Sequence, residues 1–409
     1  MMQRDTVLLY SRRTLAVSLT VMTAGVLFSI ALSSVAFAFA GAAFLALALL
    51  DPHSVLKTSH IDGFILAWTA AVLVMVAFAI YPASSLGSAK RLLLVLVVFF
   101  LPAAFPASRD LRRFLIVLAV AAGLQSLLGI LHQILGNEER LGLFQHYMTG
   151  GGLRMILLLL FLPLLIDRGT PRRERAIIAA AVALMLVALV LTMTRSSWLG
   201  FAAGAVLIGA LRYRMLIPAL AVVLLLVFLI APRQYRERLS LMFTTQKTEL
   251  KGETGGEAVV QSNQSRMRMW RTGWQMFLDH PVVGVGDGEM YMMYREYVPD
   301  AIKDEGGHLH NTYIHVLATH GAVGLLAMLA LFGAIAWREW RIIRREKGNA
   351  TGALALGALA AFTGFLVNGM AEYNFGDHEI VLLLWMTFGL VNAAAAAGFR
   401  WTDDTMEST

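Results

Sequence analysis

Four histidines stand close together in the segment GGHLHNTYIHVLATHGAVG, residues 306–324. An imidazole at a membrane surface keeps a pKa near 6.5 unless it is perturbed, so His310 could accept a proton at neutral pH. Gly321 and Gly324 follow His310 by about three and four helical turns. The spacing predicts one helix stripe, with His310 at the surface and two glycines beneath it that admit another helix. His315 and His320 lie deeper and are expected to be hydrogen-bonded core residues.

Arginines that could bind an anionic substrate occur in two other segments. Arg195 lies in TMTRSSWLG, a predicted tight turn between two apolar stretches. It either extends to phospholipid headgroups or points at an anionic substrate. Arg266, Arg268 and Arg271 form a second group, which is either a solvated helix face or a source of bidentate contacts to phosphate. A pyrophosphate needs at least two such contacts, and Arg195 with one residue of this group would supply them.

A metal site is an alternative for the histidine segment. His308 and His310 form an H-x-H pair, and Asp304 and Glu305 are nearby carboxylates. No third ligand has a defining spacing, so we expect no metal. GVGDG at 284–288 lacks the strand and helix that a nucleotide-binding loop requires, and its expected role is to redirect the chain after Pro281. Four further polar residues, which line the same cavity or form a polar loop, are Glu372, Asn374, Asp377 and His378.

The composition predicts that apolar helices in a lipid bilayer position these residues. The chain has 409 residues, of which 58% are hydrophobic, 15% are charged and none is cysteine. About 25% charge is usual in soluble domains, so a soluble fold is excluded, as are a disordered chain and a disulfide scaffold. The net charge of +7 does not indicate nucleic acid, because in a membrane protein the distribution of charge over the loops is what matters.

Twelve stretches are apolar enough to cross a bilayer as helices of roughly 20 residues. The apolar run that ends at Leu50 is too long for a signal peptide, so it predicts two retained spans broken at Ser33–Ser34. The fourth and eighth spans are short. The predicted spans are 14–32, 34–50, 63–80, 91–106, 114–134, 150–166, 176–193, 197–211, 215–231, 311–337, 351–372 and 379–398.

The distribution of Lys and Arg predicts the orientation. With a cytoplasmic N-terminus, the inner loops hold nineteen basic residues and the short outer loops hold five. Both termini are therefore expected in the cytoplasm, and 232–310 is expected outside. The predicted organisation is a membrane domain 1–231, an outer segment 232–310 with amphipathic helices, a membrane domain 311–398 and a cytoplasmic tail 399–409.

Within the outer segment, 244–264 is polar and predicts a mobile loop. The following stretch predicts an amphipathic helix that lies on the membrane and ends at Pro281. Its apolar side carries Met267, Trp270, Trp274, Phe277 and Leu278, and its three arginines fall largely on the other side. A second short helix is expected near 289–298, in the aromatic belt.

The histidine segment resembles the signature of bacterial O-antigen ligases: His310-Asn311, nine residues, then Gly321-x-x-Gly324. TRSSW at 194–198, RMRMW at 266–270 and DHPVVGVGDG at 279–288 precede it in the order typical of the family. The resemblance covers about 190–330 by motif. The superfamily also contains O-antigen polymerases and O-linked oligosaccharyltransferases, and the histidine motif does not separate them.

The resemblance implies an all-α polytopic, GT-C-like glycosyltransferase of the bacterial inner membrane, with one large periplasmic segment. It would use neither metal nor other cofactor. The implied donor is a glycan on undecaprenyl pyrophosphate, and the acceptor is a hydroxyl of lipid A–core oligosaccharide. By position, His310 is similar to the family's essential histidine, and Arg195 and Arg266 to its essential arginines. Inversion of the anomeric centre is expected. His310 acts as the base or only orients the acceptor.

Other residues are expected to contribute to substrate binding. Among the arginines of the second group, Arg266 alone has the R-x-x-x-W spacing to Trp270. Arg154 and Asn311 are expected to be further substrate contacts. The partners implied are the donor, the acceptor and membrane lipids, with no nucleic acid.

Three alternative functions agree less well with the sequence than the ligase does. A polymerase would lengthen the lipid-linked glycan, and an oligosaccharyltransferase would modify a protein hydroxyl. The single large outer segment favours the ligase, because polymerases commonly have two large outer loops. A twelve-span transporter usually has a long central inner loop and binding residues near mid-membrane, whereas the central loop 167–175 is short.

Overall fold

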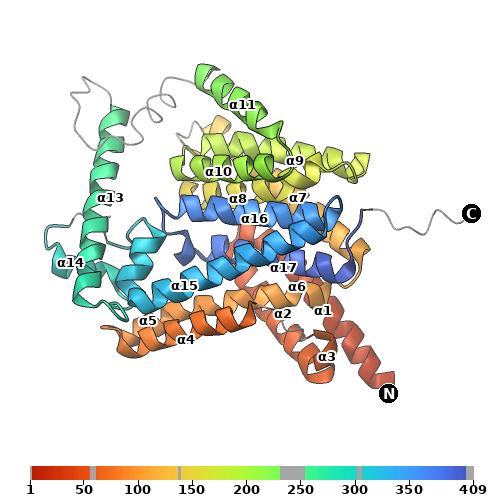
Figure 1. Cartoon of the computed structure of the whole chain (residues 1–409), viewed down its shortest axis with the longest axis horizontal. Helices are drawn as coiled ribbons and strands as arrows, with labels where there is room; N and C mark the ends of the chain where they lie inside the picture. The colour runs from red at the N-terminus through yellow and green to blue at the C-terminus, as the bar shows by residue number, and fades with distance from the viewer. Residues whose placement is uncertain (1, 56–60, 137–139, 231–253, 302–305, 402–409) are drawn as a thin grey trace, which may run out of the picture.

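The computed structural model describes residues 2–55, 61–136, 140–230, 254–301 and 306–401. Every secondary-structure element in these ranges is a helix, which confirms the all-α prediction (Figure 1). In chain order the helices are α1 (Met2–Phe28), α2 (Ile30–Leu50), α3 (Pro52–Val55), α4 (Asp62–Phe78), α5 (Pro82–Ala89), η1 (Lys90–Leu96), α6 (Val97–Ala104), α7 (Ser108–Gly136), α8 (Tyr147–Ile166), α9 (Arg172–Leu191), α10 (Arg195–Leu211), α11 (Leu216–Ile230), α13 (Thr254–Asp279), α14 (Met290–Tyr297), α15 (Thr312–Arg345), α16 (Ala350–Asn368), η2 (Asn374–Gly376) and α17 (His378–Ala397).

A helix occupies each of the twelve predicted spans. Among the described residues, eight helical stretches are long and apolar enough to cross a membrane, and α4 and α10 are shorter apolar helices. The protein is therefore a multi-pass membrane protein, while the count of twelve spans stays a prediction.

Two boundaries differ from those predicted. The first break lies at Ser29, not at Ser33–Ser34, because the Ser29 side chain accepts a hydrogen bond from the Leu32 amide and so begins α2. The fourth span begins at Pro82, before the predicted residue 91, since α5, η1 and α6 form one continuous helical stretch. Pro82 stands in the first turn of α5, where its missing amide proton costs no hydrogen bond.

The centre of the bundle consists of α8, α16 and α17, which are buried on nearly every side. Small residues allow neighbouring helices to approach them closely. A Cβ at Gly200 of α10 would lie 2.6 Å from the carbonyl oxygen of Gly364 of α16. Such close backbone contact is how helices pack in lipid, where apolar burial alone does not drive association.

The two ends of the bundle differ. In Figure 1 the first residues of α1 and the last turn of α17 lie at the right, whereas α13 and α14 lie at the left. α13 runs across the axes of α15 and α16, as expected for a helix on a membrane surface. This agrees with the start of α1 and the end of α17 on one side and the described residues 254–301 and 306–310 on the other. The identity of each side stays a prediction.

The amphipathic helix of the outer segment is present as α13, but it begins at Thr254. The predicted mobile loop is therefore wrong for 254–264, and its residues 244–253 lie outside the described part of the chain. Met269, Thr272 and Met276 form the buried face of α13, which packs on α15. Three of the predicted apolar residues, Met267, Trp274 and Leu278, remain exposed. These exposed side chains suit a membrane surface.

The second short helix is present as α14. Met290, Met293 and Tyr294 are buried in a small core with residues of α13 and α15, so Tyr294 is a core residue and not part of an aromatic belt.

α15 is broken at Gly321, whose backbone has φ 64° and ψ −166°. The segment 281–286 fills the break: Ala322 N donates to Pro281 O at 2.9 Å, and Val285 N donates to Ala318 O at 3.0 Å. A Cβ at Gly321 would lie 2.3 Å from Val282 O. The predicted stripe that joined His310, Gly321 and Gly324 in one continuous helix is therefore wrong. The partner of Gly321 is the turn at 281–283, not another helix.

Candidate functional site

A polar cavity of about 450 Å³ lies between α8, the segment before α14, the segment before α15 and the loop between α16 and α17. It is at the end of the bundle where α13 and α14 lie. The segment on its α15 side includes His308 and His310, and the α16–α17 loop contributes Glu372, Tyr373 and Asp377.

His310 lies immediately before α15 and is held by the helix cap. Asn311 is the N-cap: its Oδ1 accepts hydrogen bonds from the amides of Tyr313 and Ile314, and its Nδ2 donates to Met370 O at 2.8 Å. His310 itself has φ 47°, a left-handed conformation that is uncommon for a residue with a side chain. Backbone strain of this kind is frequent at functional sites. Asn311 is buried, and both its Oδ1 and its Nδ2 have backbone partners, so it positions His310; its contact with substrate stays a prediction.

The decisive contact of the site is between His310 and Glu372. His310 Nδ1 lies 2.9 Å from Glu372 Oε1, and His310 is 21% exposed at its side chain. Because an ionised carboxylate only accepts hydrogen bonds, Nδ1 carries the proton. The other ring nitrogen, Nε2, is then left with a lone pair in the neutral ring. Glu372 therefore holds His310 in the tautomer of a general base.

The other oxygen of the same carboxylate faces Arg266. Arg266 Nη2 lies 3.4 Å from Glu372 Oε2, and its Nη1 donates to Ala371 O at 2.7 Å. Burial alone would raise the pKa of Glu372, but the hydrogen bond from His310 and the charge of Arg266 lower that pKa to about 2. Glu372 is thus ionised at neutral pH.

His308 is the neighbour of this pair. Burial and the nearby His310 lower the pKa of His308 to about 4. Its Nδ1 is 3.4 Å from the His310 amide nitrogen, which donates to it. His308 is therefore neutral at pH 7 and acts as an acceptor for the backbone that carries His310.

α13 connects Arg195 to this site and carries Arg266 and Trp270. Arg195, at the first position of α10, donates from Nη2 to Asn263 Oδ1 at 3.0 Å. Asn263 and Arg266 are three residues apart, so they share one face of α13. Trp270, one turn further, donates from Nε1 to His310 O at 3.4 Å. The R-x-x-x-W spacing thus places Arg266 and Trp270 on one face of α13, where Trp270 binds the His310 backbone and Arg266 faces the carboxylate that binds His310.

The other two arginines of α13 face away from the site. Arg268 lies 3.7 Å from the exposed Asp300, and Arg271 is exposed. Only Arg266 of this group faces the site, as its spacing to Trp270 predicted.

Arg154 is not at the cavity. It is 3% exposed, and it donates to Gly150 O and to Gln125 Oε1, both at 2.8 Å. It links α8 to α7 inside the bundle, and its contact with substrate stays a prediction. Its position after a glycine run at the end of a span did not distinguish an inward from an outward side chain.

A second set of polar residues supports the cavity and was not predicted as a group. Asp287 forms an ion pair with Arg91, and its Oδ1 lies 3.1 Å from His315 Nε2. Burial would raise the pKa of Asp287, but the hydrogen bond from His315 and the charge of Arg91 lower it to about 2. His315 and His320 are buried, and Thr319 Oγ1 lies 2.8 Å from His320 Nδ1. The prediction that both are hydrogen-bonded core residues is confirmed.

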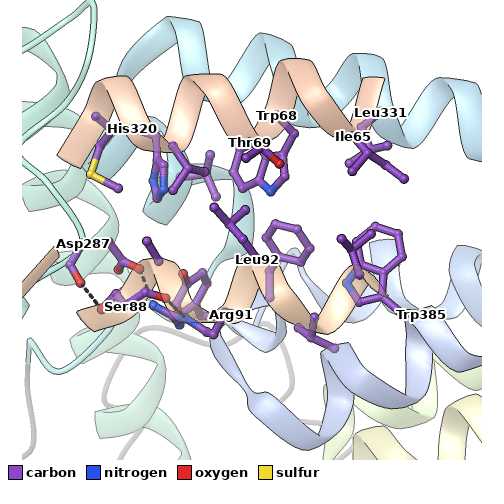
Figure 2. A pocket seen from close by; sticks show the side chains of 18 residues that line it. Ile65, Trp68, Thr69, Ser88, Arg91, Leu92, Asp287, His320, Leu331 and Trp385 are labelled. Carbon is purple, nitrogen blue, oxygen red and sulfur yellow. Dashed lines mark hydrogen bonds and ion pairs between the residues drawn. The ribbon is translucent and has the colours of Figure 1, made fainter. Parts of the chain in front are cut away.

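A smaller pocket lies deeper in the bundle, between α4, η1, α15 and α17 (Figure 2). Trp68, Leu92 and Trp385 give it mainly apolar walls, and Arg91 and Asp287 separate it from the polar cavity. Its volume is about 50 Å³, which is less than twice the share of one water molecule in the liquid, about 30 Å³. A sugar ring therefore fits only the larger cavity.

Three groups at the site could hold a metal ion. His308, His310 and Glu372 each offer one ligand atom, and these atoms lie within 4.8 Å of one another. The nearest nitrogens already have partners, since His310 Nδ1 binds Glu372 and His308 Nδ1 accepts from a backbone amide. Asp304 and Glu305, the carboxylates considered from the sequence, lie outside the described residues.

Comparison with known proteins agrees with the geometry. Residues 180–329 match the family model described as O-antigen ligase. This segment is therefore similar to O-antigen ligases, over somewhat more than a third of the chain. The match includes Arg195, Arg266 and His310, which confirms the family resemblance of the motifs. Glu372 and Arg91 lie beyond it. The match associates this membrane protein with O-antigen ligase- or polymerase-like glycosyltransferases.

A curated relative is the teichuronic acid biosynthesis protein TuaE of Bacillus subtilis (strain 168). It is 26% identical to this chain over 133 residues, which is 32% of this chain and 26% of TuaE. The match thus spans about a quarter of the relative's length.

Proposed function

We propose that this protein is an O-antigen ligase. It transfers a glycan en bloc from undecaprenyl pyrophosphate to a hydroxyl of lipid A–core oligosaccharide, at the periplasmic face of the bacterial inner membrane. The observation that supports this most is the single carboxylate, Glu372, that binds His310 with one oxygen and faces Arg266 with the other.

The pair of His310 and Glu372 supplies the base. The acceptor hydroxyl gives its proton to His310 Nε2 as its oxygen attacks the anomeric carbon. Positive charge then develops on the imidazole, and the ionised Glu372 stabilises that charge across the 2.9 Å hydrogen bond. General base catalysis of this type contributes about 10²–10⁴-fold.

The arginines supply the positive charge that the leaving group requires. As the new bond forms, the bond between the anomeric carbon and the pyrophosphate oxygen breaks, and undecaprenyl pyrophosphate leaves with the electron pair. Arg266 and Arg195 stabilise the negative charge that develops on this leaving group. Arg266 is a residue of α13, and Arg195 binds Asn263 of the same helix, so the donor pyrophosphate lies beside α13. The acceptor lies in the cavity on the His310 side. Attack opposite the leaving group inverts the anomeric centre.

A reconstituted transfer reaction tests the proposal. The purified protein in liposomes receives undecaprenyl-pyrophosphate glycan and lipid A–core, without ATP or added metal, and products are separated on a gel. We expect glycan on lipid A–core with the wild type and none with His310→Ala. His280→Ala, which changes an exposed histidine after α13, serves as the control and keeps full transfer. Near-normal transfer by His310→Ala would refute the assigned base.

A second candidate function is polymerisation, in which the acceptor is the sugar end of another lipid-linked glycan. The histidine motif does not separate the two activities, and the relative's name, teichuronic acid biosynthesis, does not mention lipid A–core. The same reaction separates the two: glycan that lengthens on its own carrier, with lipid A–core unmodified, identifies a polymerase.

A further inference from the structure

A second large cavity lies at the opposite end of the bundle from the candidate site. It has a volume of about 520 Å³ and is bordered by α1, the turn after α6 and the start of α7. α1 and α7 run in parallel here: Arg12 and Arg113 both line the cavity, whereas at the far end Gln145 joins Val26 O to Gln125 of α7. Arg12 and Val26 are fourteen residues apart, or about 21 Å along the helix.

The entrance of this cavity is positively charged. Three arginines line it, Arg12, Arg13 and Arg113, against one aspartate, Asp110. Arg113 and Asp110 are 3.8 Å apart and largely exposed, so they form a weak pair. Arg12 Nε is buried, and no described residue accepts a hydrogen bond from it. Buried donors of this kind normally have an acceptor, so Arg12 Nε is suited to donate to a ligand in the cavity.

The deeper part of the cavity is apolar. One turn beyond the arginines it is lined by Val17 of α1 and Val117 of α7, which are 63% and 43% exposed. Phe105 and Phe114 contribute further apolar surface at its floor. The cavity thus has a cationic entrance at one level of the membrane and an apolar wall below it, on two parallel helices.

We propose that this cavity binds one anionic glycerophospholipid. Its phosphate accepts hydrogen bonds from Arg12 and Arg13, because a guanidinium matches phosphate with two parallel N–H groups. One acyl chain lies along Val17 and Val117. An acidic protein segment fits less well, since it would leave this apolar wall uncovered. Basic pockets between transmembrane helices are a known type of site for anionic lipid headgroups. The inference does not depend on the proposed transferase function.

Native mass spectrometry of the full-length protein in detergent tests this inference. We expect a retained adduct with dioleoylphosphatidylglycerol and none with dioleoylphosphatidylcholine at the same concentration. Arg12→Gln should lower the occupancy about fivefold or more. Arg109→Gln removes the same charge from an exposed position of α7 outside the cavity and should leave occupancy unchanged. Equal loss in both variants would show general attraction to charge and would overturn the proposal.

A second pair of variants tests the apolar wall without a change in charge. Val117→Phe fills the space for the acyl chain and should remove the adduct, whereas Val120→Phe, on an exposed part of α7 outside the cavity, should not. Retention of the lipid by Val117→Phe would contradict the proposal. Equal occupancy by the two lipids would also contradict it, and so would thermal stabilisation by inorganic phosphate equal to that by phosphatidylglycerol.

Discussion

Gly321 of α15 lies directly against the backbone of Val282, and this contact joins two sequence motifs into one structural unit. The carbonyl oxygen of Val282 occupies the space where a Cβ of residue 321 would lie, and Val323 N donates to the same oxygen at 3.2 Å. The DHPVVGVGDG segment therefore replaces the helical hydrogen bonds that α15 loses at its break. The nine residues from Thr312 to His320, which follow His310, are thereby fixed relative to α13.

Gly321→Ala should destabilise the protein and reduce transfer. The backbone at φ 64° and ψ −166° is accessible almost only to glycine and costs about 1–3 kcal/mol for other residues, and the added Cβ would lie 2.3 Å from Val282 O. We expect a lower thermal unfolding temperature in detergent. Gly333→Ala, in the same helix with open space around it, should be neutral or stabilising by up to about 1 kcal/mol. Equal effects of both changes would contradict this account.

Glu372→Gln should lower kcat by about 10²-fold or more with little change in KM. The amide cannot hold the His310 proton with a full charge, and the imidazolium that forms in the reaction loses its counter-ion. Glu289→Gln is the matched control, because Glu289 lines the same cavity but binds Ser84. The measurement is steady-state transfer by the reconstituted protein. A normal kcat for Glu372→Gln would remove Glu372 from the mechanism.

The sequence was sufficient to predict the helices and the three motif residues of the site. Apolar stretches of span length can satisfy their backbone in lipid only as helices or closed barrels, so the all-α membrane fold followed from composition. His310, Arg195 and Arg266 could be found because the family motifs mark them. The structure brings His310 and Arg266 to one carboxylate and connects Arg195 to the same helix, α13.

The sequence was not sufficient where the fold depends on distant contacts. Glu372 was among the polar residues considered for the cavity, but its contact with His310, 62 residues earlier, was not predicted, because a carboxylate in a loop between two spans has many ordinary explanations. The stripe of His310, Gly321 and Gly324 was wrong because periodicity assumes a continuous helix, whereas α15 begins after His310 and is broken at Gly321. The structure places Arg154 inside the bundle, which could not be predicted because sequence position does not say which way a side chain at the end of a span points.

Arg266→Lys should reduce transfer about 10²-fold while the protein still folds. Lysine keeps the positive charge but loses the planar pair of donors that reaches both Ala371 O and Glu372. Arg271→Lys, on the exposed side of the same helix, should change transfer by less than about twofold. Equal activity of the two variants would indicate that Arg266 acts only as a charge on a lipid-facing helix.

A chelator should leave transfer unchanged. The proposed reaction uses His310 as the base and arginines as the cations, and the closest ring nitrogens of His308 and His310 already have hydrogen-bond partners. The measurement is the transfer rate after dialysis against EDTA. Inhibition by EDTA that added zinc reverses would instead identify His308, His310 and Glu372 as a functional metal site.

The stability of the protein should fall as the pH falls from about 4.5 toward 2. The pKa of Glu372 and that of Asp287 are both lowered to about 2 in the folded protein, from ordinary values of 4.5 and 3.8. A lowered pKa means that the unfolded chain binds more protons in this interval, so the stabilisation is complete above about pH 4.5 and is lost on acidification. Thermal unfolding of the wild type in detergent should therefore shift to lower temperature between pH 5 and pH 3.

Glu372→Gln should show a smaller shift, because one of the two carboxylates is gone, whereas Glu289→Gln should match the wild type. An equal shift in Glu372→Gln and the wild type would show that the ion pairs of Glu372 do not contribute to stability.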